Sequence, residues 1–188
     1  FAPGTRTQYT NTAFVVLGII AEMAGGQPIE ALYQELWAPL GLTEIYFPGA
    51  VAPSGPVAPA LSPAGLVEPM DHLSLLTGAN TAFGMLATAR AVAVWGRAFF
   101  GGSIFTAATQ AAIRTLVPAA GNIPGESGAG LAIRSYQYLG RTQYGHSGGS
   151  SIGSSLLLFD SDTGITVVVI MNQGQGADHF ALAPELLD

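Results

Sequence analysis

The chain has 188 residues, only 10% of them charged, and a formal net charge of −6 at pH 7. This length suits one domain with a substantial core or part of a larger fold, and the acidic balance leaves no basic surface for nucleic acid. The absence of cysteine excludes disulfides, thiolate metal sites and a cysteine nucleophile. The strongest apolar runs, 14–20 and 165–171, fall short of the roughly 20 residues that cross a bilayer, so we expect no membrane span.

Two helices are predicted near the N-terminus. Apolar residues recur at helical spacing over 14–23, and Gly25-Gly26 has the chemistry of a helix C-cap. A second helix is expected from Pro28 to about Trp37, before Pro39 and Gly41 stop it. We expect the two helices to pack as a pair.

The middle of the chain is predicted to be irregular and then helical. Five prolines within 49–69 exclude a helix or a central strand there. Thr88 is placed to cap a helix that ends at Gly101, and Thr106 to cap another that reaches Leu116. A glycine-rich loop is expected over 121–130.

The last third is predicted to be an antiparallel meander. Four runs rich in β-forming residues are separated by turns at 140–141 and 160–164. A C-terminal helix over 177–188 would cover the sheet. The expected strands are 131–138, 142–147, 152–159 and 165–171.

One of these runs contains the pentapeptide GHSGG at 145–149, which fits the G-x-S-x-G pattern of a hydrolase nucleophile elbow. With Asp160 or Asp178 and then His179 downstream, Ser147 would be the nucleophile of an α/β-hydrolase fragment. An elbow, however, needs an apolar strand before it and a helix after it, and this motif has the reverse context. We therefore prefer another interpretation, in which Gly148 lets a ligand lie close to the strand and the Gly149 N–H faces an oxyanion.

Three segments resemble the serine β-lactamase and penicillin-binding-protein family, which includes DD-carboxypeptidases and esterases. Residues 1–44 are similar to the segment around the family's Tyr-x-Asn motif, here Tyr9-Thr10-Asn11. Residues 84–102 are similar to its helical region, and residues 144–173 to its third motif and the two strands that follow. The third motif has Lys or His, then Ser or Thr, then Gly. The first motif, Ser-x-x-Lys, is absent because the chain has no lysine.

The resemblance implies a role for each matching residue. Tyr9 would relay a proton between nucleophile and leaving group, which requires nearby positive charge because a phenol is a poor base at neutral pH. Asn11 would bind the substrate amide. The alternatives are a structural tyrosine packed at a helix entrance and an asparagine that caps the helix.

In the third motif, His146 would stand where many relatives have lysine and would carry a partial positive charge at pH 7. Ser147 and Gly148 would contact substrate, and the Gly149 N–H would be one oxyanion donor. His72 and His179 have no partners at metal-ligand spacing, so we expect no metal site and no cofactor.

The fold class implied is α+β: an antiparallel sheet flanked by helices, with a helical subdomain, incomplete at the N-terminus. We treat 1–188 as one partial domain, with the Tyr-x-Asn segment at 1–47, a loop-rich helical region at 48–130, and strands with a C-terminal helix at 131–188. The activity implied is that of a serine hydrolase acting on an amide or ester (a β-lactam, a D-Ala peptide or an ester) through an acyl-enzyme. The alternative is a non-catalytic ligand-binding relative of the same fold.

The missing first motif leads to two expectations. The chain alone should be inactive, and its uncovered apolar surface and sheet edge should be met by a companion N-terminal chain or a strand-exchanged oligomer. The chain starts at Phe1 without a signal-like segment, so an upstream piece is expected. The cell envelope or the exterior is implied for a carboxypeptidase, and the cytoplasm for an esterase.

Overall fold

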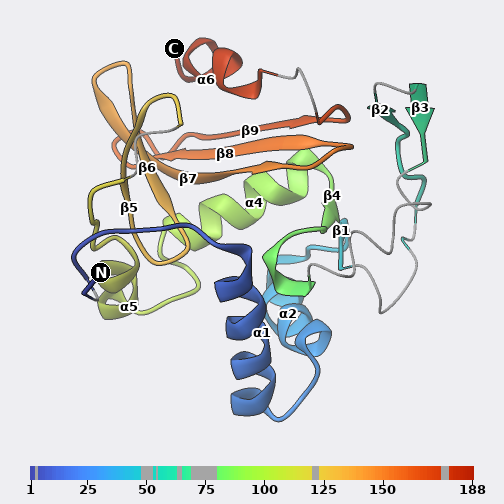
Figure 1. The fold of residues 1–188 in the computed structure, drawn as a ribbon, viewed down its shortest axis with the longest axis horizontal. Coiled ribbons are helices and arrows are strands. Elements are labelled where there is room, and N and C mark those ends of the chain that lie inside the picture. The colour runs from blue at the N-terminus through green and yellow to red at the C-terminus, as the bar shows by residue number, and fades with distance from the viewer. Residues whose placement is uncertain are drawn as a thin grey trace.

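The computed structural model describes residues 1–2, 4–47, 53, 55–62, 65–68, 80–119, 123–174 and 178–188. The main feature is a five-stranded antiparallel sheet in the order β5-β6-β7-β8-β9. Its strands follow the chain without crossovers (Figure 1). They are β5 (Glu126–Ala129), β6 (Arg134–Tyr138), β7 (Arg141–Gly149), β8 (Ser154–Asp160) and β9 (Thr166–Met171).

Helices cover both faces of this sheet. Helix α4 (Ala89–Phe100) packs against β8 and β9 on one face, and α6 (His179–Leu187) packs against the same strands on the other (Figure 1). The core under α6 includes Tyr136, Leu156 and Leu158, all fully buried. The core on the α4 side contains Phe100 and Phe159. The architecture is therefore α+β, as the sequence predicts.

The N-terminal helices form a separate unit below the sheet (Figure 1). Helix α1 (Asn11–Gly25) ends where Gly26 adopts a left-handed conformation, with φ of 66°. Helix α2 (Ile29–Trp37) follows and continues into a 3₁₀ turn, η1 (Ala38–Leu40). Trp37 is buried in a cluster of apolar side chains that also receives Trp95 of α4. The predicted helix pair is confirmed, and both tryptophans belong to the core.

The remaining elements are short. Strands β1 (Ile45–Tyr46) and β4 (Leu86–Ala87) pair with each other, as do β2 (Ala60–Ser62) and β3 (Gly65–Val67). Helix α5 (Ala107–Ile113) and the 3₁₀ turn η3 (Asn80–Ala82) complete the set. The β2–β3 hairpin stands outside the main sheet, so no described part of the proline-rich stretch forms a central strand.

Several predicted boundaries are wrong; strand β7, for example, extends to Gly149 instead of residue 147, and β8 starts at Ser154 instead of residue 152. Helix α5 stops at Ile113 instead of Leu116, because Val117 exchanges backbone hydrogen bonds with Ala129 and needs extended backbone. Part of the expected glycine-rich loop is strand β5, because residues 126–129 pair with β6. Strand β6 starts at Arg134 instead of residue 131, because Ala132 adopts a positive φ of 58° in the turn before it.

The predicted caps and turns hold. The Thr88 and Thr106 hydroxyls accept hydrogen bonds from Ala91 N–H and Thr109 N–H at the starts of α4 and α5. The turn after β8 is organised by Asp160, whose carboxylate accepts the backbone N–H groups of Asp162 and Thr163. Capping and turn chemistry are local, which is why the sequence alone could place them.

No single described helix is long and apolar enough to cross a membrane. The segments Asn11–Gly25 and Ile29–Leu40 together satisfy the length and composition required, but they are bent by 82° at their junction.

Candidate active site

The candidate site begins where the pairing between β6 and β7 stops and β7 is paired only with β8. Strand β6 pairs with β7 only from Arg134, opposite Gly145, to Tyr138, opposite Arg141. Strand β8, in contrast, pairs with β7 as far as Gly149. From His146 to Gly149, therefore, no described strand lies along the second edge of β7. A free strand edge offers backbone donors and acceptors to a ligand.

Tyr9 lies beside this free edge. Its ring centroid is 5.8 Å from that of His146 and 5.8 Å from that of Phe14 in the first turn of α1. The Tyr9 side chain remains 48% exposed. The fold thus brings together a phenol and an imidazole from opposite ends of the chain, and both remain partly open to solvent.

His146 has a defined tautomer when it is neutral. Its Nδ1 atom lies 2.6 Å from the carbonyl oxygen of Ser147. A carbonyl oxygen only accepts hydrogen bonds, so this contact requires the proton on Nδ1. Nε2 then carries the lone pair and can accept a proton from a neighbouring group.

The pKa of His146 is lowered from its usual value of 6.5. Burial is the main cause, the hydrogen bond to Ser147 opposes it, and the positive charge of Arg134 adds to the lowering. The expected partial positive charge on His146 at pH 7 is therefore smaller than the sequence indicated, mainly because burial disfavours the charged imidazole. The neutral form predominates at pH 7.

Asn11 is the first residue of α1 and is exposed. The N-cap of this helix is Thr10, so the interpretation of Asn11 as the cap is wrong. Asn11 follows Tyr9 by two residues at the mouth of the helix. Its role in binding a substrate amide stays a prediction.

Ser147 follows His146 along β7, and its side chain points to the other face of the sheet. Neighbouring residues on a strand point to opposite faces, and Ser147 lies beside the buried phenol of Tyr136 in the core under α6. Burial raises the pKa of Tyr136 to about 12, although Ser147 opposes the shift. Ser147 thus points to the face of β7 opposite that of His146, and its contact with substrate stays a prediction.

Gly148 and Gly149 are exposed at the end of β7. A side chain at Gly148 would approach the Ser155 hydroxyl to 2.7 Å, so glycine is favoured there. A side chain at Gly149 would meet no atom within 4 Å, so the space on its Cα side is open. The part of Gly149 as an oxyanion donor is compatible with this position.

The elbow hypothesis for Ser147 is wrong. Ser147 lies inside the antiparallel strand β7, paired with Leu156 of β8. No helix follows it; the chain turns at 150–153 and returns as β8. His179, proposed as its base, is buried at the start of α6, where neither ring nitrogen has a hydrogen-bond partner among the described residues.

Arg134 is a site residue that the sequence analysis missed. Its Cζ atom lies 5.4 Å from the centroid of the Tyr9 ring, and its guanidinium pairs with the carboxylate of Glu126. Its sequence signal is weak, since an arginine at the start of a strand is common. In a chain without lysine, however, each arginine is a candidate source of the permanent charge that Tyr9 needs.

The described residues contain no group of three or more His, Asp or Glu side chains that could hold a metal ion. Asp71 and His72 lie outside the described residues.

A family model described as Beta-lactamase matches residues 1–188. This chain belongs to the β-lactamase family. Solved structures of related folds agree with the match. The D-amino acid amidase from Ochrobactrum anthropi SV3, complexed with D-phenylalanine, superimposes with a TM-score of 0.83 at 21% identity, over 100% of this chain and 59% of the amidase.

Two further structures are similar. The D-stereospecific amidohydrolase from a Streptomyces species has a TM-score of 0.78 at 26% identity, over 95% of this chain and 54% of its own. The octameric penicillin-binding protein homologue from Pyrococcus abyssi has a TM-score of 0.82 at 24% identity, over 100% of this chain and 43% of its own. This β-lactamase-family chain therefore spans about half the length of the structures it matches, and it corresponds to part of their fold.

Proposed function

We propose that residues 1–188 are the later part of a serine hydrolase that cleaves an amide or ester through an acyl-enzyme. The observation that carries the proposal is the contact between Tyr9 and His146 at the free edge of β7. Membership of the β-lactamase family supports the same reaction class.

The chemistry would proceed in two steps. A serine oxygen attacks the substrate carbonyl carbon, the C–N or C–O bond to the leaving group breaks, and water then hydrolyses the ester formed on serine. Tyr9 would pass the serine proton to the leaving amine or alcohol, with the Nε2 lone pair of His146 as a hydrogen-bond acceptor nearby. The Gly149 N–H would stabilise the oxyanion.

The nucleophile would come from outside residues 1–188. No choice of serine within the chain gives Ser-x-x-Lys, because the chain has no lysine. We propose that a segment or companion chain with this motif packs against α1. Substrates would be β-lactams, D-Ala peptides or esters, and the amidase and amidohydrolase relatives direct attention to D-amino acid amides.

The surface of α1 supports a missing partner. Apolar residues surround this helix on all sides, which is typical of a buried helix, yet Gly18 is its only residue classed as buried. Met23 is 80% exposed. The other large apolar residues of α1 that are exposed are Val16, Leu17, Ile19 and Ile20.

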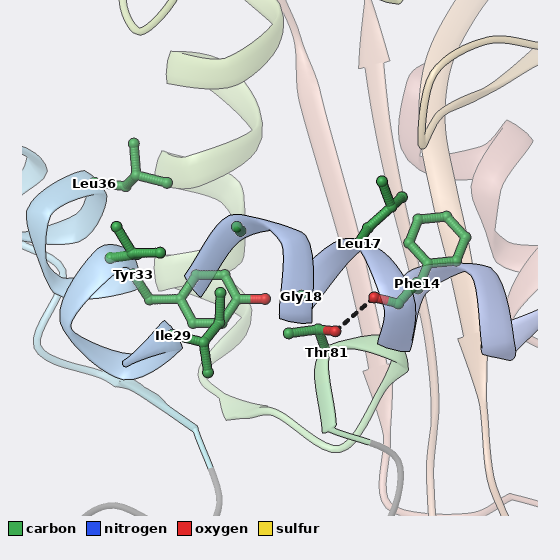
Figure 2. A pocket seen from close by; sticks show the side chains of 9 residues that line it. Phe14, Leu17, Gly18, Ile29, Tyr33, Leu36 and Thr81 are labelled. Carbon is green, nitrogen blue, oxygen red and sulfur yellow. Dashed lines mark hydrogen bonds between the residues drawn. The ribbon is translucent and has the colours of Figure 1, made fainter. Parts of the chain in front are cut away.

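A hollow beside α1 and an edge of the main sheet are two further places where a partner could pack. An apolar hollow of about 280 Å³ lies between α1 and α2, lined by Leu17, Gly18 and Tyr33 among others (Figure 2). Thr81 closes one side, where its hydroxyl donates to the carbonyl oxygen of Phe14 at 2.6 Å. Strand β9 is the last strand of the described sheet, and just past its end Leu61 of β2 forms a bridge with Gln173. We propose that the exposed face of α1, the hollow and the β9 edge contact the part of the fold that the longer relatives have in addition to the matched region.

The alternative function is a non-catalytic binding protein that would bind its ligand at Tyr9, Asn11 and His146 without turnover. The absence of lysine favours it. Covalent labelling separates the two functions: the complete native protein is incubated with a fluorophosphonate or a labelled penicillin, and its mass is measured. A stable adduct supports the hydrolase. No adduct with either reagent, despite reversible ligand binding, supports the binding protein.

A further inference from the structure

Arg134 occupies the position where the paired part of β7 ends. It is the first residue of β6 and lies opposite Ala129 of β5 and Gly145 of β7. Gly145 has no side chain to compete for space on that side of the sheet, and a Cβ there would collide with the backbone of Leu157. The long side chain of Arg134 is therefore free to extend to the site.

The guanidinium of Arg134 is held in place by Glu126. The two side chains form an ion pair between β6 and β5, and they are 13% and 1% exposed, respectively. An almost fully buried carboxylate needs a partner, so this pair fixes where the guanidinium can lie. Its charge is permanent, because arginine does not lose its proton in proteins.

The same guanidinium contacts the Tyr9 ring. Its Cζ atom is 5.4 Å from the ring centroid, within the range of a cation–π interaction. Tyr9 comes from residues 4–10, which the structure describes without a helix or strand. Its ring is therefore oriented by contacts with Phe14, His146 and Arg134.

We propose that Arg134 is the positioning residue of the site: its guanidinium, anchored by Glu126, holds the Tyr9 ring against His146 and places a permanent positive charge beside both rings. The catalytic part of this role rests on the proposed function; the positioning part does not. His146 then acts as a neutral hydrogen-bonding group, and Arg134 is the cation. The charge contribution of Arg134 to the lowered pKa of His146 agrees with this assignment.

The test is an NMR titration of the complete native protein. We expect nuclear Overhauser contacts in the wild type between the Arg134 side chain and the Tyr9 ring, and between the Tyr9 and His146 rings. Arg134→Met should raise the pKa of His146 and weaken the Tyr9–His146 contact. Arg134→Lys keeps the charge but not the planar group, so it should leave the His146 titration near that of the wild type while still weakening the Tyr9 contact.

Arg90→Met is the matched control. It removes one positive charge from an arginine side chain that is 80% exposed on α4 and lies 3.9 Å from Glu44. This variant should change neither the His146 titration nor the Tyr9 contacts. If Arg134→Met also leaves both unchanged, or if the wild type lacks the Arg134–Tyr9 contact, the proposal is overturned. The wild-type contact and Arg134→Lys decide the question if Arg134→Met does not fold.

The outcome is independent of the proposed function. If the NMR contacts are found but the complete protein takes no label, Arg134 still positions Tyr9 and the hydrolase proposal fails. If the complete protein takes label and the NMR contacts are absent, the hydrolase stands and the inference on Arg134 fails. If the NMR contacts and the covalent labelling are both observed, Arg134→Met should slow labelling at least tenfold relative to Arg90→Met.

Discussion

The rings of Tyr9 and His146 lie 5.8 Å apart, centroid to centroid, with 41° between their planes. Tyr9 precedes the first helix, and His146 lies in the third strand of the main sheet. The contact joins the Tyr-x-Asn segment to the Gly-His-Ser-Gly-Gly strand across the free edge of β7. The fold thus brings these two segments together, and the first two predictions below start from this contact.

Tyr9→Phe removes the hydroxyl that we propose relays the proton and keeps the ring that packs on Phe14 and His146. In the complete protein we expect acylation by a fluorophosphonate or penicillin to slow by about 10²–10⁴-fold, the usual contribution of general acid–base catalysis. Stability should change by less than about 0.5 kcal/mol, because Tyr9 is 48% exposed. Tyr46→Phe in β1 is the matched control and should label at the wild-type rate.

The pH dependence of labelling should follow His146. Its pKa is lowered by burial, so the neutral form with a free Nε2 persists below pH 6.5 and is lost only at still lower pH. We expect labelling of the complete protein to fall on the acidic side with an apparent pKa below 6.5. An apparent pKa above 6.5, assigned to His146 by NMR, would mean that a carboxylate and not burial governs this histidine.

Asp160 should be the carboxylate that matters most for acid stability. Burial alone would raise its pKa, but hydrogen bonds from Thr163, Gln143 and Asp162 and the charge of Arg141 together lower it below the ordinary 3.8. The unfolded chain therefore takes up the proton first as the pH falls. The stability that Asp160 contributes is complete above pH 3.8 and is lost as the pH falls through its lower folded-state pKa.

Asp160→Asn should lower the free energy of unfolding at pH 7 by about 1.5–3 kcal/mol, because charged acceptors make the stronger hydrogen bonds. Arg141, which lies 2.7 Å from Asp160, also donates to the Leu187 carbonyl at the end of α6, so the C-terminal helix should loosen as well. Urea unfolding measures the effect. The control is Asp162→Asn, an exposed position that should stay within about 0.5 kcal/mol of the wild type.

The exposed face of α1 predicts an effect on association. Ile20→Glu puts a charge where we expect a companion segment to bury an apolar side chain worth about 1.5–3 kcal/mol. Binding of that segment should weaken by about tenfold or more, as measured by light scattering or calorimetry. Gln34→Glu adds the same charge on an exposed part of α2 and should leave binding of the companion segment unchanged.

A chain that is monomeric alone and binds no segment with Ser-x-x-Lys would contradict this expectation. A stable strand-exchanged dimer would instead show that a second copy of the chain takes the place of the companion segment.

The sequence predicted the elements whose ends carry local chemistry. Gly26, Thr88 and Thr106 define helix ends through their own backbone or hydroxyl groups, so neighbouring residues suffice to place them. Strand β5 was missed because its composition of Glu, Ser, Gly and Ala is that of a loop, and only its pairing with β6 makes it a strand. Pairing is a property of the fold and not of the segment.

The candidate site was predictable only in part, because some of its residues stand in recognisable local motifs and others do not. Tyr9 and His146 stand in motifs that can be read along the chain, and the fold brings them together. Arg134 has no motif; its place beside Tyr9 depends on the register of β6 with β7 and on the ion pair with Glu126. Likewise the lowered pKa of His146 depends on burial and on a charge from another strand, which the sequence does not reveal.

The most direct test of the central claim is to locate the acyl group. The complete native protein is labelled with a fluorophosphonate or penicillin, digested, and the modified peptide is identified by mass spectrometry. We predict that the label lies on a serine outside residues 1–188, within a Ser-x-x-Lys sequence, and that Tyr9→Phe slows its formation. A label on Ser147 or on any other residue of 1–188 would contradict the account.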